Sequence, residues 1–344
     1  MRPTRRDVLV LGGGMATGAA LSTYVSPERR RAGRGGRRPG AADRGDEEYV
    51  WVSAHAHLPL FVARDHPALF QVGEELGVRV TIVGPDTVDI PGLVAALEQT
   101  AARRPSGIMV VGWDPSALIP AIDRAVESGV PVVCVDADVP ASKRLAFIGT
   151  DWYDLGVRQG EAMLTALRGR RGEVAMIGLI EQSIDQRAFA GFRSVAEPAG
   201  LTDLEPQHDK GNQAEAGRVA AAILQARPDL VGIAGFDSQS GPGMGQAIRE
   251  AGRVGRVVAT CVETEEQHLR LLKEGVLTAC VGQKRELFTY YGVRALRDYA
   301  HATVQITANG RKAGISPIPV NYNTGTFTVT RNNVDEFLAG RGQG

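Results

Sequence analysis

Short apolar runs rich in β-branched residues alternate with amphipathic helical segments from Tyr49 almost to the end of the chain, and this alternation constrains the fold most. Such runs are typical of buried strands, and apolar residues at three- and four-residue spacing indicate helices. The predicted strands cover 49–54, 78–84, 107–113, 130–136, 146–150, 173–179, 230–236, 256–262 and 278–283. The predicted helices cover 61–76, 90–104, 114–129, 152–168, 187–199, 213–226, 243–252, 264–274 and 286–301. Because strands that alternate with helices form parallel sheets covered on both faces, the two series predict two doubly wound α/β lobes.

Polar and aromatic residues stand directly after several of these strands. Asp136 and Asp138 follow one strand, and Trp113, Trp152 and Phe236 follow three others. Ligands of such folds bind outside the carboxyl ends of the strands, where carboxylates accept hydroxyl protons and aromatic rings form apolar walls. We therefore expect these side chains at a ligand cleft. Capping is the alternative for the two acids, and burial in a lobe core is the alternative for the three aromatic residues.

The N-terminal 45 residues differ in sequence pattern from the rest of the chain. Residues 4–11 read TRRDVLVL, so Arg5 and Arg6 precede an apolar run that is diluted by glycine and extends to residue 25. This pattern predicts a twin-arginine export signal, either cleaved or kept as a membrane tether. The turn LVLGGGMATG is similar to a dinucleotide-binding loop, but an Arg- and Gly-rich linker follows it in place of a second strand. We therefore assign 1–45 to an export signal and linker, and expect no cofactor.

Charge and cysteine content argue against a nucleic-acid-binding protein and against a fold held by disulfides or zinc. Residues 1–45 contain ten arginines and three acids, so the remaining chain has 29 basic against 36 acidic side chains and is net acidic. An acidic body does not favour nucleic acid as a partner, since phosphate binding requires clustered Lys and Arg. The three cysteines are too few and too scattered for a disulfide framework or a zinc motif, and apolar neighbours predict buried thiols at Cys134 and Cys280.

Three segments in the same order resemble the ribose-type periplasmic sugar-binding family, whose type I fold also forms the effector domains of lactose-repressor-like regulators. The segments are GIMVVGWDPSALIPAIDRAVESGVPVVCVDADVP, RVVATCVETEEQHLRLLKEGVLTACVGQ and NTGTFTVTRNNVDEFL. The likeness runs from about residue 49 to 338. It implies a chain that crosses between the lobes three times, near Thr150, Gln283 and Gly314. The N-terminal lobe would then be 46–149 plus 284–313, and the C-terminal lobe 150–283 plus 314–344.

The resemblance also implies ligand-binding residues. Asp136 matches the family's first-lobe sugar aspartate, and Gln283 matches its hinge glutamine. Glu263, twenty residues before Gln283, stands where the family usually has an aspartate. Arg187 opens the helix before Gly191, where the family has a sugar-binding arginine; surface ion pairing is its alternative. Phe61 stands at the position of an aromatic residue that stacks on the sugar ring.

Two departures from the family pattern concern the ligand. The family often reads Asn-Pro-Phe-Phe where this chain reads Leu58-Pro59-Leu60-Phe61, and Phe236 replaces an asparagine. Each change exchanges a hydrogen-bonding amide for an apolar group. His55 and His57 precede the first of these segments, and we expect hydroxyl contacts or a loop role from them. No third ligand cluster supports a metal, and no calcium-loop pattern occurs, so no metal site is predicted.

Together these features predict an extracytoplasmic solute-binding protein of an ABC-type importer. It would be a monomer that binds a monosaccharide or polyol between the lobes, closes by its hinge and docks on a membrane permease. A sensory protein that presents sugar to a receptor kinase or chemoreceptor is the alternative. A transcription regulator would need a helix-turn-helix of about sixty residues before the first strand, where the export signal stands. An enzyme is not predicted, since no nucleophile elbow or P-loop occurs.

Overall fold

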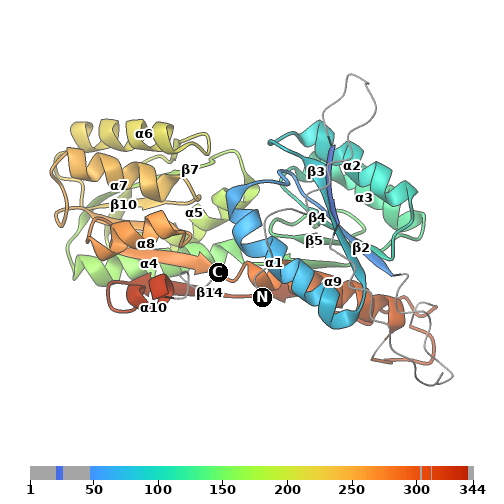
Figure 1. Cartoon of the computed structure of the whole chain (residues 1–344). Coiled ribbons are helices and arrows are strands. Elements are labelled where there is room, and N and C mark those ends of the chain that lie inside the picture. Colours follow the sequence, from blue (N-terminus) through green and yellow to red (C-terminus); the bar gives the residue numbers. More distant parts are fainter. Residues whose placement is uncertain (1–20, 26–46, 303, 311, 340–344) are drawn as a thin grey trace.

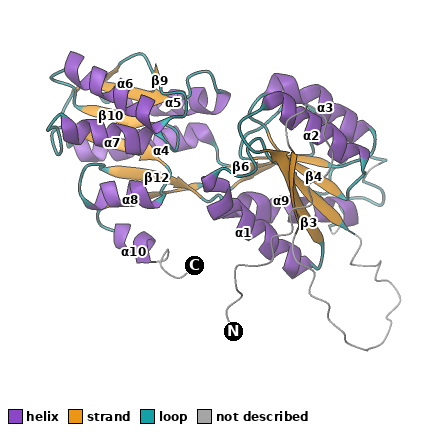
Figure 2. Cartoon of the chain, turned by 45° about the horizontal axis from the view of Figure 1, so that its top comes forward, coloured by secondary structure: helices purple, strands orange, loops and turns teal. Residues whose placement is uncertain are grey.

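The computed structural model describes residues 21–25, 47–302, 304–310 and 312–339. They form two α/β lobes side by side, which confirms the predicted fold class (Figure 1). Each lobe is built on one seven-stranded sheet, and the helices lie on both faces of each sheet (Figure 2).

The first sheet has the order β1-β3-β2-β4-β5-β6-β13, in which β2 to β6 and β13 run parallel. Its strands are β1 (Leu21–Val25), β2 (Glu48–Val52), β3 (Arg79–Pro85), β4 (Gly107–Val111), β5 (Val132–Val135), β6 (Ala146–Gly149) and β13 (Asn321–Asn323). Its helices are α1 (Pro59–Leu76), α2 (Ile90–Ala102), α3 (Pro115–Glu127) and α9 (Glu286–His301). The α1–α9 and α2–α3 pairs pack on the sheet because β2, β4 and β5 are buried along nearly their whole length.

The second sheet has the order β14-β12-β11-β10-β7-β8, with β9 also paired to β7. Its strands are β7 (Gly172–Gly178), β8 (Leu201–Asp203), β9 (Gln207–His208), β10 (Gly232–Gly235), β11 (Val258–Val262), β12 (Ala279–Gln283) and β14 (Thr326–Thr330). Its helices are α4 (Trp152–Leu167), α5 (Ser183–Ala196), α6 (Gln213–Ala226), α7 (Ser240–Glu250), α8 (Glu266–Lys273) and α10 (Val334–Ala339). One face of this sheet packs on α4 and α5 and the other on α6, α7 and α8, so both faces are core.

Local sequence signals determine where several helices begin. The Asp89, Asp114, Asp151 and Asn212 side chains each accept a backbone N–H from the first turn of α2, α3, α4 and α6. Such caps satisfy donors that have no partner within the helix. All four of these helices begin within one residue of the predicted position. The three cysteines are free and buried, which confirms the prediction of buried thiols at Cys134 and Cys280.

Three segments join the lobes. The chain leaves the first sheet after β6 and enters α4, returns from β12 into α9, and crosses again from β13 to β14. The third crossing therefore lies between Asn323 and Thr326, and not near Gly314 as predicted. The short strand β13 pairs with β6 and extends the first sheet, and its polar sequence, Asn-Tyr-Asn, has no apolar run to mark it.

The predicted export signal falls largely outside the described residues, which begin at Leu21. The last five residues of its apolar run form β1, which pairs antiparallel with β3 at the edge of the first sheet. Within the described ranges, no helix has both the length and the apolar character needed to cross a membrane.

Candidate ligand-binding site between the lobes

A cavity of about 480 Å³ lies beside the crossings and is lined from both lobes. Asp138 and Phe147 line it from the first lobe, Thr150 and Trp152 from the first crossing, and Arg187 from the second lobe. Its volume lies within the range of about 300–1,000 Å³ that is typical of small-molecule sites. Three residues predicted from sequence, Asp138, Trp152 and Arg187, are thus brought together here.

Two buried polar atoms on lining residues have no hydrogen-bond partner among the described residues. They are Thr150 Oγ1 and Trp152 Nε1, and the two residues are 1% and 7% exposed. Buried polar groups without partners are rare, because each loses its hydration without compensation. The hydroxyl and the indole N–H therefore indicate a site that binds a polar ligand.

The charged side chains of this cavity are held by neighbours. Arg144 Nη2 donates to Asp138 Oδ2 at 2.6 Å, and Arg187 Nη2 donates to Asp151 Oδ1 at 3.1 Å. Arg187 is largely exposed and forms the surface ion pair that the sequence analysis gave as its alternative role. It also lines the cavity. Its helix is held close to α4, since a Cβ at Gly191 would lie 2.0 Å from the Tyr153 carbonyl oxygen.

Asp136 lies deeper, in a buried network around an arginine that the sequence reasoning missed. Arg285 Nη1 donates to Asp136 Oδ1 at 2.7 Å, and Trp113 Nε1 donates to Asp136 Oδ2 at 3.1 Å. The other side of the guanidinium donates to Asp65, from Nε to Oδ2 at 3.1 Å and from Nη2 to Oδ1 at 3.3 Å. Phe61 packs its ring on the same guanidinium, 4.9 Å from the ring centroid.

Glu263 and Gln283 form the second-lobe part of this network. Gln283 Nε2 donates to Glu263 Oε1 at 2.5 Å, and both residues are 5% exposed. Gln283 Oε1 is buried without a partner among the described residues, so the amide keeps one unused hydrogen-bonding position. The charges of Arg285 and Asp136 both act on Glu263, which places the acids of the two lobes near one guanidinium.

Asp136 and Glu263 occupy equivalent positions in the two lobes. Each follows a buried parallel strand, and each has a left-handed backbone, with φ of +69° and +75°. The Asp136 N–H donates to Ile148 O of the next strand, and the Glu263 N–H donates to Val281 O in the same way. A non-glycine residue in this region costs about 1–3 kcal/mol and is found preferentially at functional sites.

The electrostatics of the network follow from burial. Burial raises the pKa of Asp65 to about 7 although the Arg285 charge opposes this shift. Burial and the Glu265 charge raise the pKa of Glu263 to about 8, against the effects of Arg285 and the Gln283 hydrogen bond. Burial lowers the pKa of Arg285, but the Asp136 and Asp65 charges outweigh it and the guanidinium stays charged. The raised pKa favours the protonated form of Glu263, which has a hydrogen to donate.

The structure corrects the expectation for Phe236. Its side chain is fully buried in the second lobe, where Phe189 and Phe192 pack edge-to-face against it at 4.8 and 5.8 Å. The core alternative therefore holds, because the residue after β10 turns toward the α4–α5 face. Its neighbour Asp237 was missed: it caps α7 through Gln239 N and Ser240 N, while Oδ2 is buried without a partner in the described chain.

Phe61 and the two histidines also lie away from the interlobe cavity. Phe61 is 1% exposed and contacts Arg285, so it supports the guanidinium and presents no open face for a sugar ring. His57 Nε2 lies 3.3 Å from Asp86 Oδ1, beside a separate pocket between α1 and β3. Burial lowers the pKa of His55. In the described part of the chain, no group of three His, Cys, Asp or Glu side chains is arranged as a metal site.

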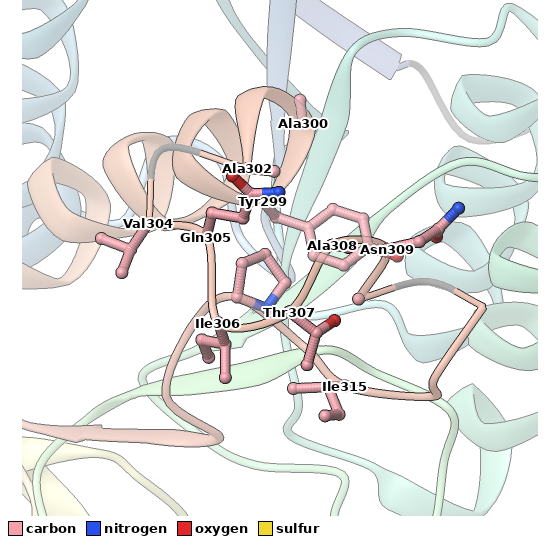
Figure 3. A pocket seen from close by; sticks show the side chains of 12 residues that line it. Tyr299, Ala300, Ala302, Val304, Gln305, Ile306, Thr307, Ala308, Asn309 and Ile315 are labelled. Carbon is pink, nitrogen blue, oxygen red and sulfur yellow. The ribbon is translucent and has the colours of Figure 1, made fainter.

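A further cavity, of about 400 Å³, lies beyond the end of α9 (Figure 3). Its apolar lining includes Val304, Ile306 and Ile315, and all of its lining residues come from the segment 299–317. It therefore does not bring the two lobes together, in contrast to the cavity at the crossings.

Comparison with known proteins agrees with this arrangement. Residues 52–303 match the family model of the periplasmic binding protein domain. The D-ribose/D-allose-binding protein of Pseudomonas aeruginosa is 25% identical over 246 residues, which are 70% of this chain and 76% of that protein. AraP, an arabinose binding protein from Geobacillus stearothermophilus, is 31% identical, with a TM-score of 0.75 over 85% of this chain and 99% of that one.

A sugar-binding protein of a sugar ABC transporter from Bacillus halodurans is 28% identical, with a TM-score of 0.78. It covers 85% of this chain, and the match spans 100% of that chain. With a family model matched over well more than half of its length, two lobes joined by three crossings and a cavity between them, the chain belongs to the periplasmic binding protein domain family.

Proposed function

We propose that the protein captures a neutral monosaccharide or polyol in the interlobe cavity, as the extracytoplasmic binding component of an ABC-type importer. The observation that carries the proposal is the cavity itself. It joins residues of both lobes, and two of its lining residues, Thr150 and Trp152, each carry a buried polar atom, Oγ1 and Nε1, that lacks a partner within the described residues. A polyhydroxyl ligand supplies donors and acceptors to such groups without bringing a charge into a buried place.

Binding here favours closure of the lobes. A ligand that touches Asp138 on one lobe and Arg187 on the other makes all of its contacts only when the lobes approach. It therefore binds the closed state more tightly than the open state and shifts the population toward closure. The three crossings are the segments that change conformation.

The relatives support the ligand class and the partner. The D-ribose/D-allose-binding protein and AraP are named for sugars, and the Bacillus halodurans protein belongs to a sugar ABC transporter. The proposal extends this to the present chain: export by the twin-arginine segment, a role as a monomer, and recognition of the closed form by a membrane permease.

The ligand class is tested by thermal unfolding of the full chain with D-ribose, D-allose, D-xylose, L-arabinose, D-arabinose, D-tagatose and myo-inositol. A ligand at about 100 times its Kd stabilises the folded state by about 2.7 kcal/mol, which raises Tm by several degrees. Isothermal titration calorimetry on each hit gives the Kd and the stoichiometry. No stabilisation by any of these compounds would contradict the proposed ligand class.

The proposed export route is tested separately. The double substitution Arg5→Lys and Arg6→Lys keeps both charges but removes the twin-arginine pair. We expect the variant to remain in the cytoplasm of a host that exports the wild-type chain. Normal export of the variant would contradict this part of the proposal.

A further inference from the structure

We propose that Cys261 and Cys280 form an intramolecular disulfide when the chain folds under the oxidising conditions found outside the cytoplasm. The two residues are nineteen positions apart in the sequence, and the sheet of the second lobe brings them together. The inference goes beyond the proposed function, because it rests on the register of two strands and not on the ligand. It assigns a covalent modification site to the second lobe.

The pairing of β11 with β12 places the two cysteines at disulfide distance. Cys261 and Cys280 lie directly opposite each other in this parallel ladder. Neighbouring strands are about 4.7–4.9 Å apart, which falls within the Cα–Cα range of about 4.4–6.8 Å that disulfides require. The two Sγ atoms are 3.5 Å apart. Closure to a bond of about 2.05 Å therefore needs a small rotation of both side chains and leaves the strands in place.

Both thiols are shielded once the chain has folded. Each residue is 0% exposed, in a core that includes side chains of α7 and α8. A Cβ at Gly241 of α7 would lie 3.0 Å from Cys261 Sγ, so this helix comes close to the pair. Burial and the neighbouring Cys280 thiol raise the pKa of Cys261, which disfavours the reactive thiolate. The bond therefore forms during folding, before α7 and α8 pack on the sheet.

The reaction is a thiol–disulfide exchange with a disulfide oxidant, for which glutathione disulfide is the probe. The thiolate of one cysteine attacks the oxidant, forms a mixed disulfide with one glutathione and releases the other as a thiol. The thiolate of the second cysteine then attacks the protein sulfur of the mixed disulfide and releases the remaining glutathione. The protein loses two hydrogen atoms, and their two electrons and two protons pass to the two glutathione thiols.

The disulfide acts at the base of the second-lobe part of the site. Glu263 follows Cys261 by two residues, and Gln283 follows Cys280 by three. The cross-link holds the two strands that carry Glu263 and Gln283 in one register and limits the conformations of the unfolded chain. We therefore expect the oxidised protein to have a higher Tm and slower amide hydrogen exchange in β11 and β12.

The test starts from the full chain, unfolded in urea with a reductant. After removal of the reductant, the chain is refolded in either a mainly oxidised or a fully reduced glutathione buffer. Free thiols are then alkylated with iodoacetamide under denaturing conditions and counted by mass spectrometry. The oxidised buffer should leave one free thiol, that of Cys134, and the reduced buffer should leave all three.

Two further readouts locate the bond and measure its effect. Tryptic digestion of the oxidised protein should give the fragments 257–270 and 274–284 as one cross-linked species, which a reductant separates. Thermal unfolding should show a Tm several degrees higher for the oxidised than for the reduced protein.

The matched control is Cys134→Ala. Cys134 is also a fully buried strand cysteine, but it lies in β5 of the first lobe, whereas the two other cysteines lie in the second. This variant should keep the cross-link and the difference in Tm between the two buffers. Cys261→Ala should lose the cross-link and have the same Tm in both buffers.

The outcomes separate this inference from the proposed function. Three free thiols after refolding in the oxidised buffer, or a cross-link that includes Cys134, would overturn the inference and leave sugar binding unaffected. Should the chain not refold from urea, cell-free synthesis in the same two glutathione buffers provides the same comparison, with the same expected thiol counts.

Discussion

Gln283 and Arg285 stand two residues apart on the second crossing, and they hydrogen-bond the acids of opposite lobes. Gln283 Nε2 donates to Glu263 in the second lobe at 2.5 Å, and Arg285 Nη1 donates to Asp136 in the first lobe at 2.7 Å. A backbone rotation between them moves the two acids relative to each other. The crossing is therefore a connector between the two halves of the site.

The stability of the protein should fall as pH rises, because of Glu263. Its pKa is about 8 in the folded protein, against an ordinary value of 4.5. Between these values the folded chain holds a proton that the unfolded chain has released, so rising pH favours unfolding, and the loss is complete above about pH 8. Glu263→Gln removes this proton. In urea unfolding at pH 5 and pH 9, the variant should lose about 4 kcal/mol less than the wild type.

Asp65 adds a similar decline in both proteins, since its pKa is raised to about 7. The difference between wild type and Glu263→Gln isolates the Glu263 contribution, provided that the other charges around it are unchanged. Those charges are Glu265, Arg285 and Asp136. An identical pH dependence of the two proteins would show that Glu263 is ionised in the folded chain.

Local signals made most of the fold predictable. The run 132–135 is buried throughout, and Asp114 with Pro115 marks the start of α3 by both a cap and a proline at the first position. These features act within a few residues. The third crossing was misplaced because β13 is three residues long and is defined by its pairing with β6, far away in the sequence.

The site was only partly predictable for the same reason. A strand end identified Asp136 and the family resemblance pointed to Glu263, but no spacing rule shows that Arg285 lies between Asp136 and Asp65, a residue 220 positions away from it. Phe236 also ends a strand, and the sequence does not decide whether such a side chain turns to the cleft or the core. Packing against Phe189 and Phe192 decides it.

Removing Asp65 should be strongly destabilising. Asp65→Ala leaves a buried guanidinium with one carboxylate in place of two, and breaking a buried ion pair costs about 3–5 kcal/mol. The control is Glu161→Ala, which breaks an exposed pair with Arg158 and should cost less than about 1 kcal/mol. Urea unfolding measures both variants. Equal costs would show that Arg285 does not depend on Asp65.

The contact between α4 and α5 should not tolerate a methyl group. Gly191→Ala would place its Cβ 2.0 Å from the Tyr153 carbonyl oxygen, so α5 has to move away from α4. We expect a loss of about 1–3 kcal/mol or more and a shift of Arg187, which α5 carries. Ala190→Ser, at an exposed position of the same helix, should stay within about 0.5 kcal/mol. Wild-type stability for Gly191→Ala would mean that the helices are farther apart than described.

The indole N–H of Trp152 should contribute to ligand affinity and not to stability. Trp152→Phe keeps an aromatic ring beside the cavity but removes the unpartnered Nε1, so the free protein loses no hydrogen bond to any described residue. We expect near wild-type stability and about tenfold weaker binding of the sugar found in the thermal screen. Trp51→Phe is the matched control, because Trp51 Nε1 is also buried without a described partner but lies in β2, within the core of the first lobe. Calorimetry should show unchanged affinity for Trp51→Phe; equal affinity in both variants would mean that the sugar makes no hydrogen bond with Trp152.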